Sequence, residues 1–308
     1  MRQQIAIVGG GVTAGLTARL LASSGEITLV EPVRPFVGGI PEIVPRRAFL
    51  DALEVSQEDE WVANVAPQNA AWATWRNGAV KHEARLASTS DFLVYDKSRL
   101  AKLLIESAPL SRRITRDVAE IGDLMGFDRI FDCRGAKAVR NDPAYQYRQV
   151  WPARTACRYV VAASPVGCND RVMRFWSEIA ADGNKHTFFH IPVGVNRVSL
   201  GCSCTPDALI STADLFAAAA KACRVPLAEA VLFNGVAVAQ PSEMACSLVH
   251  VTPLGEAAAL SCPLSEYGTL KALSQILDVA GCEPLSATSL HRPLSGEVDP
   301  HVPQELFS

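Results

Sequence analysis

The first 31 residues constrain the fold more than any other part of the sequence. An apolar run from Ile5 to Val8 leads directly into three consecutive glycines at positions 9 to 11. An Ala- and Leu-rich pattern of helical period follows, and a second apolar run ends in Glu31. A strand, a glycine turn, a helix and a second strand in this order form the β-α-β unit that begins a Rossmann-like domain.

The spacing inside this unit predicts what it binds. Gly9 permits the tight turn, and Gly11 lets the backbone approach a pyrophosphate. Ala14 or Gly15 is expected to allow close packing of the helix on the strand. The helix N-terminus then offers N–H groups and a positive dipole end to the phosphates. Glu31 lies 22 residues after Gly9, where an acidic side chain hydrogen-bonds a ribose 2′-hydroxyl, which favours NAD or FAD over NADP.

Composition excludes several classes of protein. With 49% apolar and 20% charged residues, the 308-residue chain is an ordinary globular protein that can bury a large core. Its net charge of −3 argues against a nucleic-acid-binding or membrane-binding surface. No apolar stretch reaches the roughly 18 residues of a membrane span, and we expect a cytoplasmic protein. Nine cysteines without C-x-x-C pairs or a histidine cluster predict reduced thiols and no metal site.

Periodicity along the chain predicts the remaining elements. Helices are expected over residues 39–62 and 95–108, and a strand-like pattern covers residues 67–88. From residue 150 to residue 203 the pattern is mostly that of β-strands. Strand and helix patterns of the first kind return near residue 250, which implies that a β-rich segment is inserted into a cofactor domain.

Two later segments favour FAD over NAD. In the first, Asp132 and Gly135 form an acid-x-x-Gly turn after a strand. In the second, a strand is followed by Gly255 and Glu256, and a helix then begins at Gly268. An acid at a strand end can bind a ribityl hydroxyl, and a small-residue turn that opens a helix can present N–H groups to the pyrimidine end of an isoalloxazine ring.

The predicted fold class is α/β, with a Rossmann-like FAD-binding domain of the glutathione-reductase-2 type and an inserted, mainly antiparallel β-sheet substrate domain. The FAD-binding domain is discontinuous and the carboxyl-terminal end is a coil. The expected bounds are 1–66, 90–140 and 241–282 for the FAD-binding domain, 67–89 and 141–240 for the substrate domain, and 283–308 for the coil.

The sequence resembles the FAD-dependent monooxygenases of the p-hydroxybenzoate hydroxylase class, and within it the flavin-dependent tryptophan halogenase branch. The resemblance rests on the opening unit, residues 38–61, the helix start at residues 95–100, and Gly255-Glu256-Ala257-Ala258. It implies bound FAD, with Arg99 near the cofactor. It also implies that Glu256 makes the ribityl contact that an aspartate makes in the family.

The halogenase signature is not retained. Arg47 stands where the resemblance places the catalytic lysine, and Ser265 where it places the catalytic glutamate. The Trp-x-Trp-x-Ile-Pro signature corresponds to Thr187–Pro192, which keeps Ile-Pro and loses both tryptophans. Arginine stays charged and cannot offer a free amine. Halogenation is therefore not expected, and the resemblance implies hydroxylation of an aromatic, indole- or phenol-like substrate through a flavin C4a-hydroperoxide.

Two other functions stay open. One is a maturation enzyme that oxidises a side chain, such as tryptophan, of a partner protein. The other is a degenerate, non-catalytic flavoprotein subunit. The sequence has no second G-x-G-x-x-G for NAD(P)H, so a separate flavin reductase is expected to supply electrons, although single-component relatives also lack a second such domain.

Each catalytic candidate has a structural alternative. Arg47, with Arg46, faces the passage between flavin and substrate or lies on a solvated helix face. His190 is an acid/base group or a buried histidine of the sheet. Glu266, with Tyr267, contacts flavin or substrate or forms a structural turn. Four aromatic residues line an aromatic pocket or belong to the core: Trp72, Trp75, Phe188 and Phe189.

Overall fold

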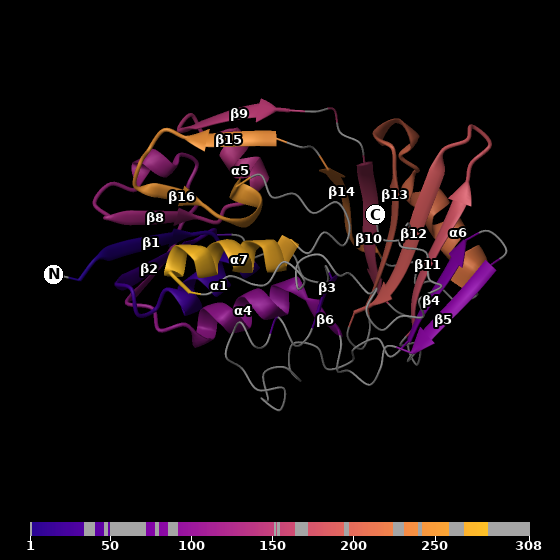
Figure 1. Ribbon diagram of the computed structural model, residues 1–308, viewed down its shortest axis with the longest axis horizontal. Coiled ribbons are helices and arrows are strands. Elements are labelled where there is room, and N and C mark those ends of the chain that lie inside the picture. Colours follow the sequence, from indigo (N-terminus) through magenta and orange to yellow (C-terminus); the bar gives the residue numbers. More distant parts are fainter. Residues whose placement is uncertain are drawn as a thin grey trace.

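The computed structural model places two sheets side by side, joined by a two-stranded ribbon (Figure 1). The structure describes residues 2–33, 41–45, 49, 72–77, 80–85, 92–150, 152, 155–163, 172–193, 197–223, 231–239, 242–258 and 268–282. None of the helices in these ranges is long and apolar enough to span a membrane.

The first sheet has five strands, all parallel, in the order β16-β8-β1-β2-β7. Its strands are β1 (Gln4–Val8), β2 (Glu26–Glu31), β7 (Arg112–Thr115), β8 (Arg129–Asp132) and β16 (Val251–Pro253). The central strand β1 is buried on both faces, as expected for a parallel sheet that other elements cover on each side. Its strand order places β1 between β2 and β8.

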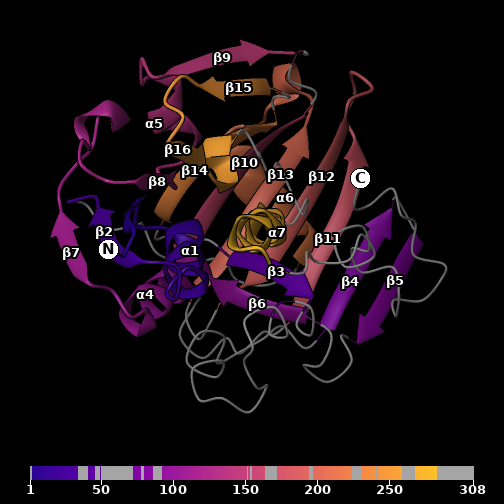
Figure 2. The ribbon, with the colours of Figure 1, turned by 60° about the vertical axis from the view of Figure 1, so that its left-hand side comes forward.

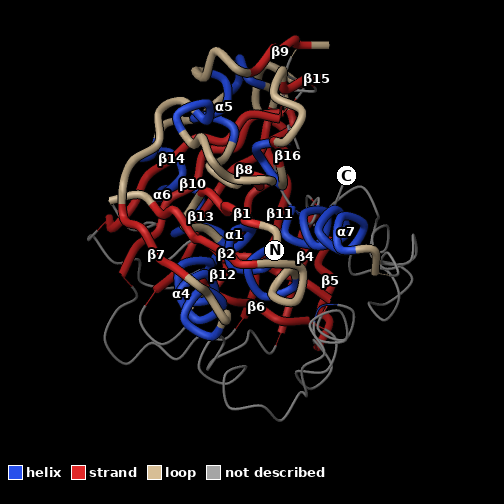
Figure 3. Tube along the Cα trace, turned by 90° about the vertical axis from the view of Figure 1, so that its left-hand side faces the viewer, coloured by secondary structure: helices blue, strands red, loops and turns tan. Residues whose placement is uncertain are grey.

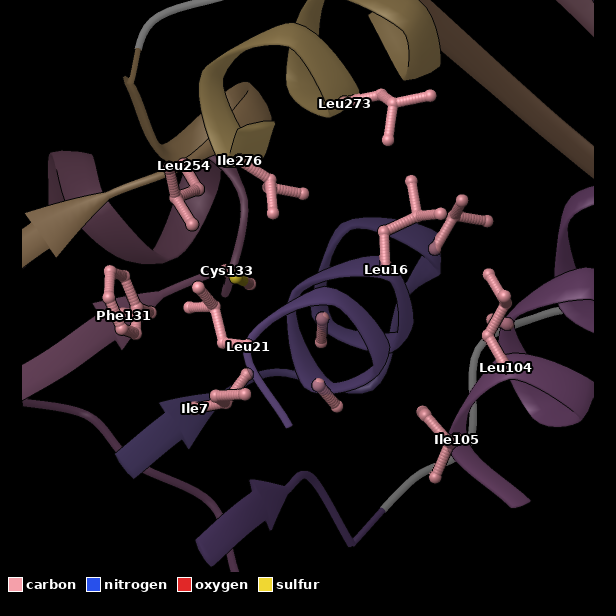
Figure 4. Close-up of a cluster of buried hydrophobic side chains, with 14 of the residues drawn as sticks. Ile7, Leu16, Leu21, Leu104, Ile105, Phe131, Cys133, Leu254, Leu273 and Ile276 are labelled. Carbon is pink, nitrogen blue, oxygen red and sulfur yellow. The ribbon is translucent and has the colours of Figure 1, made fainter. Parts of the chain in front are cut away.

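Helices cover both faces of this sheet. They are α1 (Val12–Leu20), α4 (Lys97–Ser107), α5 (Ala136–Arg140) and α7 (Gly268–Ala280). On one face, Ile5 and Ile7 of β1 share a core with α1, α4 and α7, where Leu16 lies close to Leu104 and Leu273 (Figure 4). On the other face, the alternate residues of β1 pack with Val139 of α5, and Figure 3 shows α4 and α5 on opposite sides of the strands.

The second sheet has seven strands in the order β14-β10-β13-β12-β11-β4-β5. Its neighbours are antiparallel except for β11 and β4. Helix α6 (Thr212–Cys223) packs Leu215 and Ala219 against one face. The strands are β4 (Trp72–Asn77), β5 (Val80–Arg85), β10 (Thr155–Ala163), β11 (Val172–Ile179), β12 (Lys185–Pro192), β13 (Arg197–Cys204) and β14 (Val231–Ala239).

Two pairs of strands complete the sheets. The ribbon between the large sheets is formed by β9 (Tyr145–Gln149) and β15 (Ser242–Cys246). A second pair, β3 (Pro41–Pro45) and β6 (Phe92–Asp96), leads into α4. Single 3-10 turns lie at η2 (Ile121–Asp123), η3 (Pro206–Ala208) and η4 (Gly255–Ala258).

The predicted fold class is confirmed: a parallel Rossmann-like sheet accompanies a mainly antiparallel second sheet. The helix at 95–108 and the strands within 67–88 are confirmed as α4, β4 and β5. The helix predicted over 39–62 is wrong at residues 41–45, which form β3. The pair of prolines that bound β3 is tolerated because, among the described residues, β6 is the one strand that pairs with it, so few N–H donors are needed. The domain bounds stay a prediction.

Candidate functional site

A cavity of about 430 Å³ opens at the carboxyl ends of the parallel strands. Turns that follow β1, β8 and β16 line it, together with Val30 and Pro32 around the end of β2. From β1 the chain crosses to β2, which pairs with β1 on one side, and β8 pairs with β1 on the other side. Ligands of open α/β sheets bind in the crevice at such a switch point.

The glycine turn after β1 forms one wall. Gly9 has a φ of +139°, and a Cβ there would lie 2.5 Å from the carbonyl oxygen of Cys133, so no other residue fits. Gly11 is the N-cap of α1, and nothing lies within 4 Å of the position that its Cβ would take. The first turn of α1, Val12 and Thr13, also borders the cavity. This helix end is therefore open to an anionic group.

Ala14 and Gly15 pack α1 into the core. Ala14 is fully buried. A Cβ on Gly15 would lie 2.7 Å from the Cβ of Leu104, so the close approach that this glycine allows is to α4 and not to a strand. The prediction of close packing was right about the need for a small residue and wrong about the partner of Gly15.

Glu31 ends β2 beside the cavity, between the lining residues Val30 and Pro32. Its carboxylate accepts hydrogen bonds from Arg113, from Nε at 2.5 Å and from Nη2 at 2.8 Å. The hydrogen bond to Glu31 raises the pKa of Arg113, so the guanidinium stays charged. The ribose contact of Glu31 stays a prediction, now with a neighbour that fixes the carboxylate.

The cation that borders the cavity from α4 is Lys97 and not Arg99. Asp96 caps this helix by accepting hydrogen bonds from the backbone N–H and the hydroxyl of Ser98. Lys97 is therefore the first residue of α4 and stays next to the strand end. Arg99 is two residues further, about 200° around the helix axis, and is exposed to solvent. The capping aspartate was the signal in the sequence that could have identified Lys97.

The second glycine segment reaches the same cavity from the end of the chain. Gly255 has a φ of +62°, and its N–H donates to Oε1 of Gln275 at 2.9 Å. A Cβ on Gly255 would lie 2.7 Å from Oγ1 of Thr13, so η4 sits directly against α1. Glu256 and Gly268, the first residue of α7, also line the cavity. The structure thus joins the two glycine segments that the sequence singled out.

Asp132 does not border the cavity, contrary to the expected ribityl contact. Its side chain is fully buried and accepts from Arg134, with Nη2 at 2.8 Å, and from the hydroxyl of Tyr145 at 2.9 Å. Arg134 Nη2 also donates to Asp142 at 2.5 Å. Asp142 in turn accepts from the backbone N–H groups of residues 121 and 144. This buried network positions the turn of Arg134 and Gly135, which does line the cavity.

Within the network, the opposite charges stabilise the ionised forms of Arg134 and Asp142. Burial alone would lower the pKa of Arg134, but the hydrogen bonds and charges of Asp132 and Asp142 raise it well above its usual value. Burial alone would raise the pKa of Asp142, and the hydrogen bonds from Arg134 and the backbone lower it. Burial and the neighbouring Asp132 raise the pKa of Tyr145, so its hydroxyl stays a donor. Burial likewise raises the pKa of Cys133, so this thiol is no nucleophile.

His190 lies on the face of the seven-stranded sheet that α6 covers. It is two residues from Phe188 on β12, so both side chains lie on the same face of the sheet, and it pairs in register with Leu200. Phe188 and Leu200 belong to the core beneath α6. Phe188 also stacks on Trp176, with ring centroids 5.1 Å apart. The structure therefore brings neither His190 nor Phe188 to the cavity.

Five positions that the sequence analysis singled out lie outside the described residues: Arg46, Arg47, Ser265, Glu266 and Tyr267. Within the described residues, no group of His, Cys, Asp and Glu side chains could hold a metal ion.

Solved structures share this fold, although no family model matches the chain and no curated protein matches it. A flavin-dependent halogenase from Xanthomonas campestris is 14% identical over 94% of this chain and 73% of its own, with a TM-score of 0.63. CtdE, solved with FAD and a substrate, is 14% identical over 94% of this chain and 82% of its own, with a TM-score of 0.64. The peptidyl tryptophan dihydroxylase QhpG is 20% identical over 96% of this chain and 69% of its own, with a TM-score of 0.57. At these identities the comparisons establish the architecture: the chain has the fold that these three proteins share.

Proposed function

We propose that the chain is an FAD-dependent oxidoreductase, and specifically a monooxygenase. The observation that carries the proposal is the cavity that both glycine segments and the N-terminus of α1 build at the end of the parallel sheet. The shared fold with FAD-bound CtdE supports the same cofactor.

The residues that line the cavity, together with Glu31 beside them, suit the parts of FAD. The N-terminus of α1 and the cations Lys97 and Arg116 suit the pyrophosphate. Glu31 suits the adenosine ribose, and Glu256 suits a ribityl hydroxyl. Gly268 opens α7, whose first N–H groups suit the pyrimidine end of the ring.

Bound FAD supplies two-electron chemistry and, when reduced, reactivity toward dioxygen. The chain's task is to bind an aromatic substrate beside the ring and to keep water away. One oxygen atom of dioxygen enters the substrate and the other leaves as water, with two electrons and two protons from a nicotinamide or a separate flavin reductase. We retain Arg47 and Glu266 as catalytic candidates. We give His190 a structural role in the sheet, because it lies on the face that α6 covers.

Labelled dioxygen tests this reaction. The FAD-loaded protein is reduced without oxygen, mixed with ¹⁸O₂ in the presence of indole, tryptophan or phenol, and its products are analysed by mass spectrometry. Incorporation of one labelled oxygen atom into an aromatic product is expected. Release of all reducing equivalents as free hydrogen peroxide with every substrate would contradict monooxygenation, and incorporation of halide would restore the halogenase interpretation.

A second candidate is oxidation of a side chain in a partner polypeptide. QhpG, which shares the fold, is a peptidyl tryptophan dihydroxylase. The edge strand β14 carries no charged residue, and among the described residues no strand pairs with its outer edge. Such an edge can accept an extended polypeptide. Its exposed apolar side chains are Val231, Leu232, Val236 and Val238.

Co-purification distinguishes the two substrates. A tagged chain isolated from its own cells is expected to retain a partner polypeptide with an oxidised residue if the second candidate holds. Oxygen transfer to a free aromatic compound with no such partner favours the first. A protein that binds FAD and transfers oxygen to neither is the degenerate flavoprotein subunit.

A further inference from the structure

A row of aromatic and glycine residues crosses the face of the seven-stranded sheet opposite α6. Phe189, Gly201, Tyr159 and Gly235 pair in register across β12, β13, β10 and β14. They alternate along their strands with residues of the core under α6, so their side chains point away from that helix. Figures 1 and 2 show α7 and the parallel sheet on this side of the second sheet.

The glycines let the rings lie flat on the sheet. A Cβ on Gly235 would lie 2.8 Å from Cζ of Tyr159 and 2.9 Å from its hydroxyl oxygen. The ring of Tyr159 also packs beside Phe233, with centroids 5.6 Å apart. Backbone on one side and an aromatic ring on the other fix the orientation of Tyr159, so its hydroxyl has a defined position.

Tyr159 lies on the face of the second sheet that is turned away from α6. No hydrogen bond joins it to any other described residue, and the side chain is half-buried. Burial raises the pKa of Tyr159, with opposing effects of Lys97, which lowers it, and Glu256, which raises it. Both charged residues line the cavity, and the raised pKa means that the hydroxyl of Tyr159 keeps its proton near neutral pH.

The described lining of the cavity contains no aromatic side chain. It consists of glycine, aliphatic, small polar and charged residues. These groups suit phosphates and ribose, whereas a large planar ring binds best against aromatic surface with a few placed polar groups. Tyr159 offers both on the side where Glu256 and Lys97 lie.

We propose that Tyr159 contacts the isoalloxazine end of FAD, with its hydroxyl donating a hydrogen bond to the ring and the aromatic and glycine row limiting how far the ring reaches. The contact rests on the proposed binding of FAD but not on the reaction that follows. Tyr159 would thus be a cofactor contact from the second sheet, whereas the described residues that line the cavity belong to the parallel-sheet side.

Comparing the binding of ADP with that of FAD distinguishes contacts to the adenosine end from contacts to the ring end, because ADP lacks the ring and the ribityl chain. The apoprotein, Tyr159→Phe and the control Tyr147→Phe are each titrated with both ligands. Tyr147 is the matched control because its hydroxyl bonds Ser242 in the ribbon at 2.7 Å. Tyr159→Phe is expected to weaken FAD binding about 2- to 10-fold, to shift the absorbance bands of bound FAD, and to leave ADP binding unchanged. Tyr147→Phe is expected to change none of these.

Two results would overturn the contact. Equal weakening of ADP and FAD by Tyr159→Phe would mean that the residue acts through the fold. Unchanged affinity and an unchanged flavin spectrum would mean that the hydroxyl does not touch the ring. If the folded wild-type protein binds ADP but not FAD, the proposed function itself fails, and the contact fails with it.

Discussion

Replacing Arg134 by methionine removes the cation from the buried network and leaves two carboxylates facing each other. The side chain of Arg134 is 6% exposed, those of Asp132 and Asp142 are 0% exposed, and the guanidinium also donates to the carbonyls of Val118 and Ala119 at 3.0 and 2.9 Å. Breaking one partner of a buried ion pair costs about 3–5 kcal/mol. The hydrogen bonds are not additional to this figure, because they form the same interaction.

Urea unfolding of the apoprotein, followed by circular dichroism, measures this loss. The free energy of unfolding of Arg134→Met is expected to fall by about 3–5 kcal/mol. The control is Arg148→Met, because Arg148 pairs with Glu243 on the exposed ribbon, where side chains are 74% and 59% exposed, and its loss costs at most about 1 kcal/mol. Adding Asp132→Asn and Asp142→Asn to Arg134→Met is expected to restore part of the stability. Equal effects of the two single arginine variants would refute the reasoning.

Three further predictions follow from the site. The fold lowers the pKa of Asp142, so the ionised carboxylate contributes its full stability above the usual pKa of 3.8 and loses that contribution as the pH falls below it. The free energy of unfolding of Asp142→Asn should therefore decrease less steeply with falling pH than that of the wild type. Gly9→Ala should destabilise the protein by about 2–4 kcal/mol. Gly11→Ala has open space for its Cβ, so it should cost at most about 1 kcal/mol of stability and should weaken FAD binding instead. Comparable losses of stability in the two variants would contradict this. Lys97→Met should weaken FAD binding about tenfold while Arg99→Met leaves it unchanged, and calorimetric titration would reveal the opposite order if Arg99 were the contact.

The sequence predicts the parallel sheet and its glycine turns because these depend on local patterns. Buried runs before Gly9 and Gly255 need no knowledge of distant residues, and only glycine satisfies the backbone there. Strand β3 was missed because its pattern is short and two prolines bound it, so its assignment depends on pairing with β6. Local apolar periodicity cannot report that pairing.

The site was predicted less completely, for reasons of geometry. Sequence spacing indicates that Lys97 and Arg99 both lie near a strand end, but the helix cap decides which one faces the cavity. Asp132 has the position of a ligand contact, yet Arg134 and Tyr145 occupy its carboxylate. The sequence predicted His190 as a candidate and not Tyr159. Only the register of β10, β12 and β13, together with the position of α6, shows that the two residues lie on opposite faces of the sheet. These are tertiary facts that residue types alone do not encode.

Titration of the folded apoprotein with FAD, followed by flavin absorbance and fluorescence, measures whether the cavity binds this cofactor. We expect saturation at one FAD per chain with a perturbed flavin spectrum, and weaker binding to Gly11→Ala at unchanged secondary structure. A folded protein that does not saturate with FAD, or that binds NAD⁺ in its place, would contradict it.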